Sequence, residues 1–191
     1  MSFTNEKEVK KELKNLIESS IQYRLISDVP VGAFLSGGVD SSLITAVANK
    51  FYSSKIKTFS IGFEGSSDLK HAQIVAKWIG SDHTEIKMTP DEFFDAIPTV
   101  IKAIESYDTT TVRASTGNYL VAKKISELTD CKVVFNGDGS DELFGGYLYM
   151  NRCPDNIEFD KETRRLLQDI HLFDVLRSDK SISSNGLEPR T

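Results

Sequence analysis

The sequence predicts an α/β protein built on a doubly wound parallel sheet with helices on both faces. Short apolar segments of strand length alternate with longer segments whose apolar residues recur at helical spacing. This alternation is typical of strands joined by helical crossovers, and such crossovers make a sheet parallel. Two glycine-rich turns, at residues 36–38 and 137–139, each follow a strand-like segment and precede a helical one. Because ligands of these sheets bind beyond the carboxyl ends of strands, we expect both turns to line one cleft.

The composition is that of an ordinary globular domain. The chain has 191 residues, of which 39% are hydrophobic and 27% are charged, so it can bury the core of one α/β domain. Its net charge of −5 favours neither nucleic acid nor a membrane surface as a partner. No apolar run has the ~20 residues of a membrane span, and the N-terminus has no apolar signal core. Cys131 and Cys153 form neither a metal quartet nor a disulfide framework, so a cytoplasmic location is expected.

Apolar periodicity predicts the individual elements. Residues 5–26 are expected to form an amphipathic helix, with an apolar stripe made by Val9, Leu13, Leu16, Ile17, Ile21 and Leu25. The expected strands are residues 31–35, 56–63, 81–88 and 132–136. The expected helices that follow them are residues 40–51, 68–79, 90–107, 117–128 and 160–177.

Local signals mark several of the boundaries. Gly80 is placed to end one helix, and the residues from Thr89 to Glu92 match a capping box with proline at the first helical position. Pro98 is expected to kink the helix that begins there. Residues 108–116 are interpreted as a polar loop, and residues 178–191 as a polar end without an obvious stop.

The first glycine turn has the chemistry of an anion site. Ser36-Gly37-Gly38 leads from a buried strand to a helix that opens with Asp40-Ser41-Ser42. Free backbone N–H groups and the helix dipole favour an anion there, and the serine hydroxyls add donors. The Asp40 carboxylate fits only if a divalent cation bridges it to phosphate oxygens. The turn lacks the lysine of a Walker A loop and the third glycine of a dinucleotide fingerprint, while an ordinary strand-to-helix turn remains the alternative.

The second glycine turn is acidic. Asp138, Asp141 and Glu142 fall within five residues, between glycines. One carboxylate at the start of a helix is an ordinary cap. Three of them beside Asp40 and a phosphate loop would make a magnesium and acid–base set, provided that the two turns meet.

The first turn resembles the pyrophosphate loop S-G-G-x-D-S/T-S of the N-type ATP pyrophosphatases, which have the adenine-nucleotide alpha-hydrolase-like fold. Residues 107–116 and 137–147 extend this likeness, and with the loop they resemble the synthetase domain of glutamine-hydrolysing asparagine synthetases of the B type. The similarity runs from about residue 20 to the end. The β-lactam synthetases share its outline. Families that make GMP, NAD or argininosuccinate share the first loop but not the second.

The resemblance implies an adenylating site for ATP and Mg²⁺. It assigns nucleotide contacts to Phe34, Leu35, Ser36, Gly37, Gly38, Asp40, Ser41, Ser42, Ile61 and Gly137. It assigns catalysis to Thr110, Arg113 and Asp138, and magnesium binding to Asp40 and Asp141. The implied reaction joins the aspartate side-chain carboxylate to the α-phosphate of ATP and releases pyrophosphate. Ammonia then attacks the acyl-adenylate to give asparagine and AMP.

Other interpretations of these residues stay open. One is an adenylating relative that acts on another carboxylate, such as a β-lactam synthetase. Another is a nucleotide-binding fragment without activity. Arg113 alone could also be a surface salt-bridge residue.

The sequence departs from the family pattern at three points, and each limits which functions of the family can be expected of this chain. Asp138 stands where the motif usually has the glutamate proposed as the base for ammonia, so adenylation is the safer prediction. Residue 2 is Ser, and we expect the N-terminal glutaminase domain with its cysteine nucleophile to lie outside residues 1–191. The chain also stops before the helices and the pyrophosphate-binding lysine with which the family continues.

We therefore interpret residues 1–191 as a single ATP-binding synthetase domain from a longer protein. Residues 20–150 would form its α/β core, and residues 151–191 would begin a truncated helical region. The expected partners are ATP, aspartate, ammonia and the glutaminase domain of the same full-length protein. A homodimer stays open.

Overall fold

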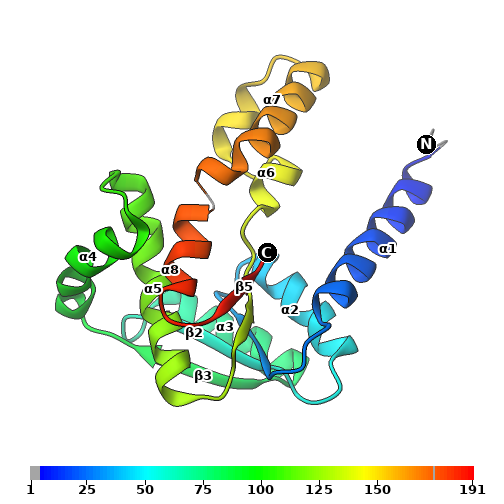
Figure 1. The fold of residues 1–191 in the computed structure, drawn as a ribbon. Helices are drawn as coiled ribbons and strands as arrows, with labels where there is room; N and C mark the ends of the chain where they lie inside the picture. Colours follow the sequence, from blue (N-terminus) through cyan, green and yellow to red (C-terminus); the bar gives the residue numbers. More distant parts are fainter. Residues whose placement is uncertain (1–4, 174) are drawn as a thin grey trace.

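The computed structural model describes residues 5–173 and 175–191 and confirms the doubly wound parallel sheet (Figure 1). In these residues the sheet has five strands in the order β3-β2-β1-β4-β5, and each neighbouring pair is parallel. The strands are β1 (Val31–Phe34), β2 (Lys57–Gly62), β3 (Asp82–Lys87), β4 (Val133–Phe135) and β5 (Glu188–Arg190).

Helices cover both faces of this sheet. The α-helices are α1 (Glu6–Arg24), α2 (Val39–Phe51), α3 (Ser67–Ile79), α4 (Pro90–Ile104), α5 (Thr109–Leu128), α6 (Ser140–Phe144), α7 (Asn156–Asp169) and α8 (Ser181–Ser183). Shorter 3₁₀ segments are η1 (Leu148–Arg152) and η2 (Ile170–Leu172), and η3 (Val175–Lys180) is a π-helix. Helices α1, α2 and α3 pack on one face, and α4, α5 and α8 pack on the other.

Alternate residues of the strands pack into two hydrophobic cores, one on each face of the sheet. Ala33 and Phe135 pack in the core that includes residues of α1 and α2. Phe59 and Val134 pack in the core formed with α4, α5 and α8. Successive side chains of a strand point to opposite faces, so the inner strands are apolar on both sides.

Several local predictions are confirmed. The capping box of α4 is complete: Thr89 Oγ1 accepts from Glu92 N at 3.3 Å, and Glu92 Oε2 accepts from Thr89 N at 2.7 Å. Gly80 ends α3 in a left-handed conformation, with φ of 72°. Pro98 lies inside α4, which continues to Ile104, and the kink expected there stays a prediction.

The predicted polar loop at residues 108–116 is wrong, because these residues begin α5. Asp108 caps the helix, and its Oδ1 accepts a hydrogen bond from Thr111 N at 2.8 Å. The hydroxyl-rich run suggested a loop, but Thr116 satisfies its hydroxyl within the helix by donating to Val112 O at 2.8 Å. An acidic N-cap and local hydroxyl bonds therefore allow a helix here.

The C-terminal part also differs from the prediction. The single helix expected at residues 160–177 is α7, followed by the segments η2 and η3. The polar end contains β5, which pairs with β4 through Glu188 N to Lys132 O at 2.7 Å and Asn136 N to Arg190 O at 3.2 Å. Proline and charged residues gave no strand signal, but an edge strand tolerates them.

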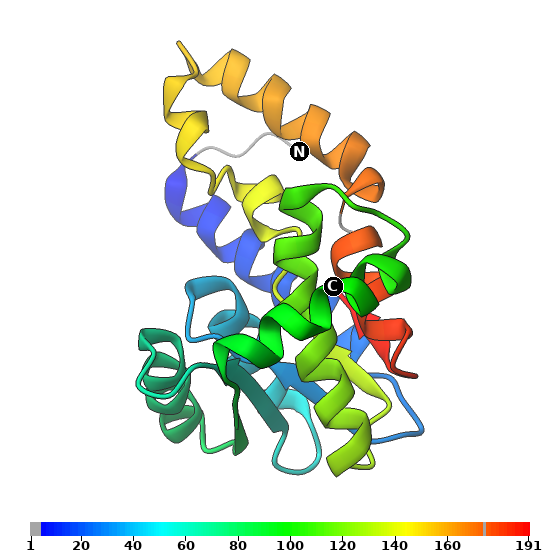
Figure 2. The ribbon, with the colours of Figure 1, turned by 90° about the vertical axis from the view of Figure 1, so that its left-hand side faces the viewer.

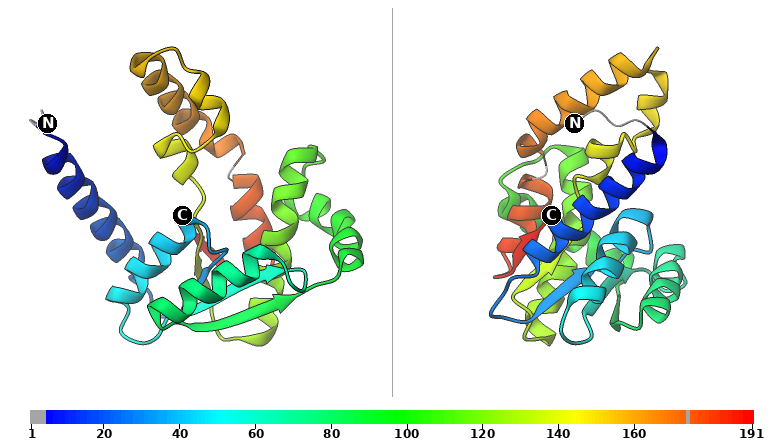
Figure 3. Two further views of the ribbon diagram at one scale, coloured as in Figure 1. Left: turned by 180° about the vertical axis from the view of Figure 1, so that it is seen from behind. Right: turned by 90° about the vertical axis from the view of Figure 1, so that its right-hand side faces the viewer.

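Helix α1 confirms its predicted span but buries only part of its apolar stripe. Ile21 is buried against α2, whereas Leu16 is 58% exposed. Figures 1 and 3 show the N-terminal part of α1 reaching beyond the sheet. None of the helices in the described residues is long and apolar enough to cross a membrane.

The fold places both glycine turns at the carboxyl edge of the sheet. The turn after β1 leads into α2, and the turn after β4 leads into α6. In Figures 1 and 2, α6 and α7 stand above this edge, away from the sheet. This edge is therefore where the predicted ligand site must be sought.

Candidate active site

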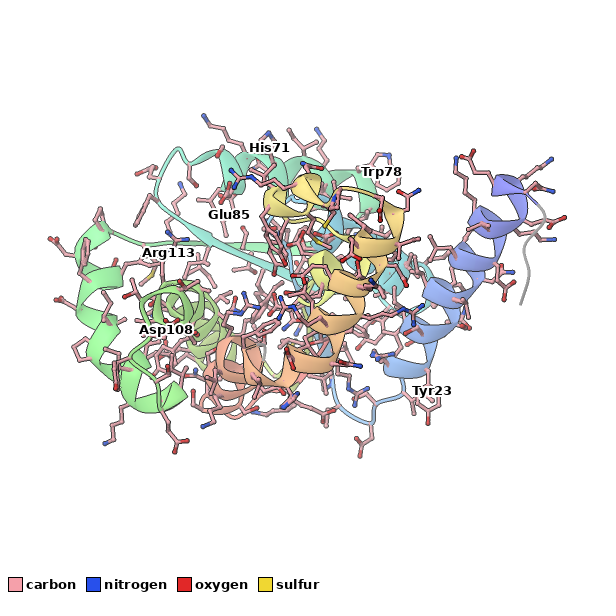
Figure 4. All side chains as sticks on the ribbon, turned by 90° about the horizontal axis from the view of Figure 1, so that it is seen from above. Tyr23, His71, Trp78, Glu85, Asp108 and Arg113 are labelled. Atoms are coloured by element: carbon pink, nitrogen blue, oxygen red, sulfur yellow. The ribbon has the colours of Figure 1, made fainter. Side chains whose placement is uncertain are left out.

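The first glycine turn is fixed by its contact with α3. Gly37 has a φ of 81°, a conformation that side chains rarely adopt. A Cβ atom there would lie 2.5 Å from Ala72 N and 2.5 Å from His71 C. Figure 4 labels His71 on α3. Only glycine fits this close approach between two backbones, so the path of the turn is set by α3.

The start of α2 offers unused hydrogen-bond donors. Its N-cap is Gly38, which supplies no capping side chain. Ser36 Oγ lies 3.0 Å from Ser41 Oγ and accepts from Gly38 N at 3.3 Å. Ser42 Oγ is buried and has no hydrogen-bond partner in the described part of the chain. The first-turn N–H groups and the Ser42 hydroxyl fit a phosphate ligand, and the Ser36 and Ser41 hydroxyls, which bond to each other and to Gly38 O, lie beside them.

The second glycine turn touches the first. A Cβ atom on Gly137 would lie 3.0 Å from Ser41 N and 3.3 Å from Asp40 Cβ. The main chain after β4 thus passes directly against the beginning of α2. This contact brings the hydroxyl-rich turn and the acidic turn to one place at the edge of the sheet.

The acidic side chains of the two turns repel each other. Burial raises the pKa of Asp141 above its usual value, and the charges of Asp40 and Glu142 raise it further, while Arg177 opposes the rise. No group of three or more His, Cys, Asp or Glu side chains in residues 5–173 and 175–191 could hold a metal ion. Two carboxylates that need a counter-charge fit Mg²⁺, which is usually held by one or two carboxylates and by substrate phosphates.

This repulsion predicts that Asp141→Asn stabilises the chain without magnesium. A carboxyl group whose pKa is raised by folding binds its proton more tightly in the folded state. Its contribution to the free energy of unfolding therefore falls as pH rises through the interval between its ordinary and raised pKa. At pH 7 in the presence of a chelator, we expect the variant to melt at a higher temperature than the wild type. This difference in melting temperature should vanish at about pH 3. Thermal unfolding at both pH values checks this, and an equal gain at each would contradict it.

Three of the residues assigned to nucleotide contacts, Phe34, Leu35 and Ile61, lie on two faces of the sheet. Phe34 and Ile61 are partly buried against the core that includes Val112 of α5. Leu35 is buried on the opposite face with Ala72 of α3. Leu35 N donates to Phe59 O at 2.8 Å, so Leu35 can offer its carbonyl oxygen, but not its side chain, to a ligand near Phe34 and Ile61.

Thr110 and Arg113 lie exposed near the start of α5, on the same side of the sheet as Phe34 and Ile61. Figure 4 shows Arg113 on this helix near Asp108, with His71 on α3 across the sheet. Correction of the predicted loop to a helix thus gives Thr110 and Arg113 a rigid support.

Comparison with known proteins decides the family. A sequence profile described as asparagine synthase matches residues 12–158. The chain belongs to the asparagine synthase family. Asparagine synthetase B [glutamine-hydrolyzing] of Escherichia coli K12 is 43% identical over 194 residues, which cover 95% of the chain and 35% of that protein. Asparagine synthetase [glutamine-hydrolyzing] of Cricetulus griseus is 44% identical over 187 residues, covering 95% of the chain and 33% of the relative.

The chain thus spans about a third of the length of these members of the asparagine synthase family. Among solved structures, an NH3-dependent NAD synthetase from Campylobacter jejuni matches with a TM-score of 0.50 and 14% identity, over 92% of the chain and 90% of the structure. At this identity the match shows the fold alone.

Asp138, which stands where the resembled motif usually has glutamate, is hydrogen-bonded to Asn136 at the end of β4. Asp138 is half-buried, and its N donates to Asn136 Oδ1 at 3.4 Å. Asn136 Nδ2 donates in turn to Asp138 Oδ2 at 3.5 Å. Asn136 itself is 4% exposed. The carboxylate of Asp138 is therefore hydrogen-bonded to the buried side-chain amide of Asn136 at the end of β4.

Sequence reasoning missed the surroundings of Glu142. This carboxylate is buried, accepts a hydrogen bond from the Tyr147 hydroxyl, and lies 3.6 Å from Arg177 Nη2. Burial and the bond to Glu142 raise the pKa of Tyr147 above its usual value. Tyr147 ends the family motif and could have been suspected, but nothing in the sequence joins Arg177 to that motif.

Proposed function

We propose that the chain is the ATP-using part of a glutamine-hydrolysing asparagine synthetase. It would adenylate the side-chain carboxylate of aspartate, release pyrophosphate, and then form the amide with ammonia. The observation that carries the proposal is the contact between Gly137 and the beginning of α2, which joins the hydroxyl-rich turn to the acidic turn. Membership of the asparagine synthase family supplies the reaction class.

The first turn would hold the leaving pyrophosphate. The main-chain N–H groups at the start of α2 and the hydroxyls of Ser36, Ser41 and Ser42 are its donors. Asp40 and Asp141 would hold Mg²⁺, which neutralises charge on the pyrophosphate when it is bound. Ile61, Phe34 and the main chain at Leu35 and Gly137 border the position proposed for the adenosine.

Helix α5 would orient the carboxylate substrate. Arg113 has a planar guanidinium that can pair with two oxygens of a phosphate or carboxylate at once. Thr110 stands one turn earlier on the same helix and adds a hydroxyl. Together they would hold the aspartate carboxylate for in-line attack on the α-phosphate.

Asp138 would take the proton from ammonia as it attacks the acyl-adenylate. It is one methylene shorter than the glutamate of the resembled motif, and Asn136 fixes its carboxylate. Ammonia would come from a glutaminase domain of the same full-length protein, since the curated relatives are named as glutamine-hydrolysing.

Exchange of pyrophosphate into ATP tests this function. We expect aspartate to stimulate the exchange, and Arg113→Ala to lower the stimulated rate on the order of a hundredfold, since removal of one oriented donor costs about that much. ATP binding in calorimetry should change little. The matched control is Arg164→Ala, because Arg164 is 72% exposed and pairs at 2.8 Å with Asp160 on the surface of α7. Exchange stimulated by a different carboxylate but not by aspartate would favour an adenylating relative instead.

A further inference from the structure

Glu142 is a buried carboxylate that the proposed reaction does not use. Only 2% of its side chain is exposed. The Tyr147 hydroxyl donates to its Oε1, and Arg177 Nη2 lies 3.6 Å from the same oxygen. A buried charge is tolerated only where it is paired and hydrogen-bonded. Glu142 therefore depends on two partners, Tyr147 from the same glycine turn and Arg177 from η3.

These contacts lie next to Asp141, the proposed magnesium ligand. Asp141 precedes Glu142 on α6, and its carboxylate folds back over Gly146, where a Cβ atom would lie 1.8 Å from Asp141 Oδ1. Gly146 N also donates to Asp141 O at 2.9 Å. Tyr147 follows Gly146 directly, so its bond to Glu142 closes residues 142–147 into a small ring beside the Asp141 carboxylate.

Arg177 connects this ring to the rest of the site. Its carbonyl oxygen accepts a hydrogen bond from Asn118 Nδ2 of α5 at 3.4 Å. Its guanidinium lies 5.1 Å from the centre of the Phe173 ring. The π-helix η3 packs on α5, which also carries Thr110 and Arg113. The orientation of α6 is thus tied to the helix proposed to hold the carboxylate substrate.

We propose that Glu142, Tyr147 and Arg177 form a positioning unit, which holds Asp141 opposite Asp40 and so sets the magnesium dependence of ATP binding. The unit acts through Asp141, and none of its members is assigned a contact with ATP. The inference rests on the proposed function, because it requires Asp40 and Asp141 to bind the Mg²⁺ that accompanies ATP.

The test is Tyr147→Phe, which removes one hydroxyl and keeps the ring. Calorimetric titration with ATP at increasing MgCl2 gives the magnesium concentration at which binding is half-maximal. We expect this concentration to rise on the order of tenfold, because a hydrogen bond to a charged, buried group is lost. ATP affinity measured in a chelator should stay within about twofold, since the donors of the first turn are untouched.

Tyr149→Phe is the matched control. Tyr149 stacks on Tyr147, with ring centres 6.0 Å apart, but its hydroxyl donates to Glu162 on the surface at 2.8 Å. We expect its magnesium midpoint to match that of the wild type. Arg177→Lys is a second test, because lysine keeps the charge but loses the planar fork, and its midpoint should rise as well.

The outcomes separate the two proposals. If Tyr147→Phe and Arg177→Lys melt earlier but keep the wild-type magnesium midpoint, the three residues only stabilise the fold and the positioning unit is refuted. If the wild-type chain itself shows no magnesium-dependent ATP binding, the proposed function fails and the inference fails with it.

Discussion

Gly37→Ala is expected to destabilise the chain by about 2–5 kcal/mol and to abolish ATP binding, since a left-handed alanine costs roughly 1–2 kcal/mol and overpacking roughly 1–3 kcal/mol. The added methyl group would press on Ala72 N and His71 C, which are backbone atoms of α3 and cannot rotate away. The turn or the helix must move, and the donors at the start of α2 move with it. Chemical denaturation gives the loss of stability, and calorimetry gives the loss of binding.

Gly65→Ala isolates the conformational part of this cost. Gly65 has a φ of 78°, close to that of Gly37, but a Cβ atom there meets nothing within 4 Å. We expect a loss of only about 1–2 kcal/mol and normal ATP binding. Equal losses of stability in the two variants would mean that contact with α3 does not fix the first glycine turn.

Asp40→Asn is expected to weaken magnesium-dependent ATP binding by roughly a thousandfold, because changes outside the ligand shell already cost 10–100-fold in metal affinity. Asparagine keeps the shape of the side chain and its place in the first turn of α2, but it removes the charge that the cation requires. Binding of ATP in a chelator should not weaken, since the variant removes a negative charge beside the phosphates.

Asp68→Asn provides the control for Asp40→Asn. Asp68 is exposed in the first turn of the neighbouring helix α3, where it accepts a hydrogen bond from the Ser67 hydroxyl at 3.2 Å. Like Asp40, Asp68 is an aspartate in the first turn of a helix, but it lies outside the proposed site. We expect its magnesium-dependent binding to equal that of the wild type, and a comparable loss would point to a general effect of charge.

Much of the fold could be predicted because its signals are local. A few consecutive residues are enough to predict the strand around Ala33, the capping box at Thr89 and the helix end at the left-handed Gly80. The loop predicted at residues 108–116 is wrong because a run of hydroxyl side chains is compatible both with a loop and with the first turn of a capped helix. The edge strand at residues 188–190 carried no signal, since main-chain bonds to the β4 segment hold it.

The candidate site divides in the same way. The serine and aspartate pattern of the first turn is contiguous, so its chemistry could be proposed before any contact was known. The approach of Gly37 to α3 and of Gly137 to Ser41 depends on tertiary packing. The pairing of Glu142 with Arg177 joins residues far apart in the sequence, and only the fold brings them together.

The central claim is that the two glycine turns form one magnesium–ATP site, and a double-mutant cycle tests it most directly. Asp40→Asn, Asp141→Asn and the double variant are titrated with ATP over a range of MgCl2. If both carboxylates bind one cation, removal of the second adds little once the first is gone, and the double variant should bind within about tenfold of the weaker single variant. If the two losses simply multiply, Asp40 and Asp141 act independently and the single site is contradicted.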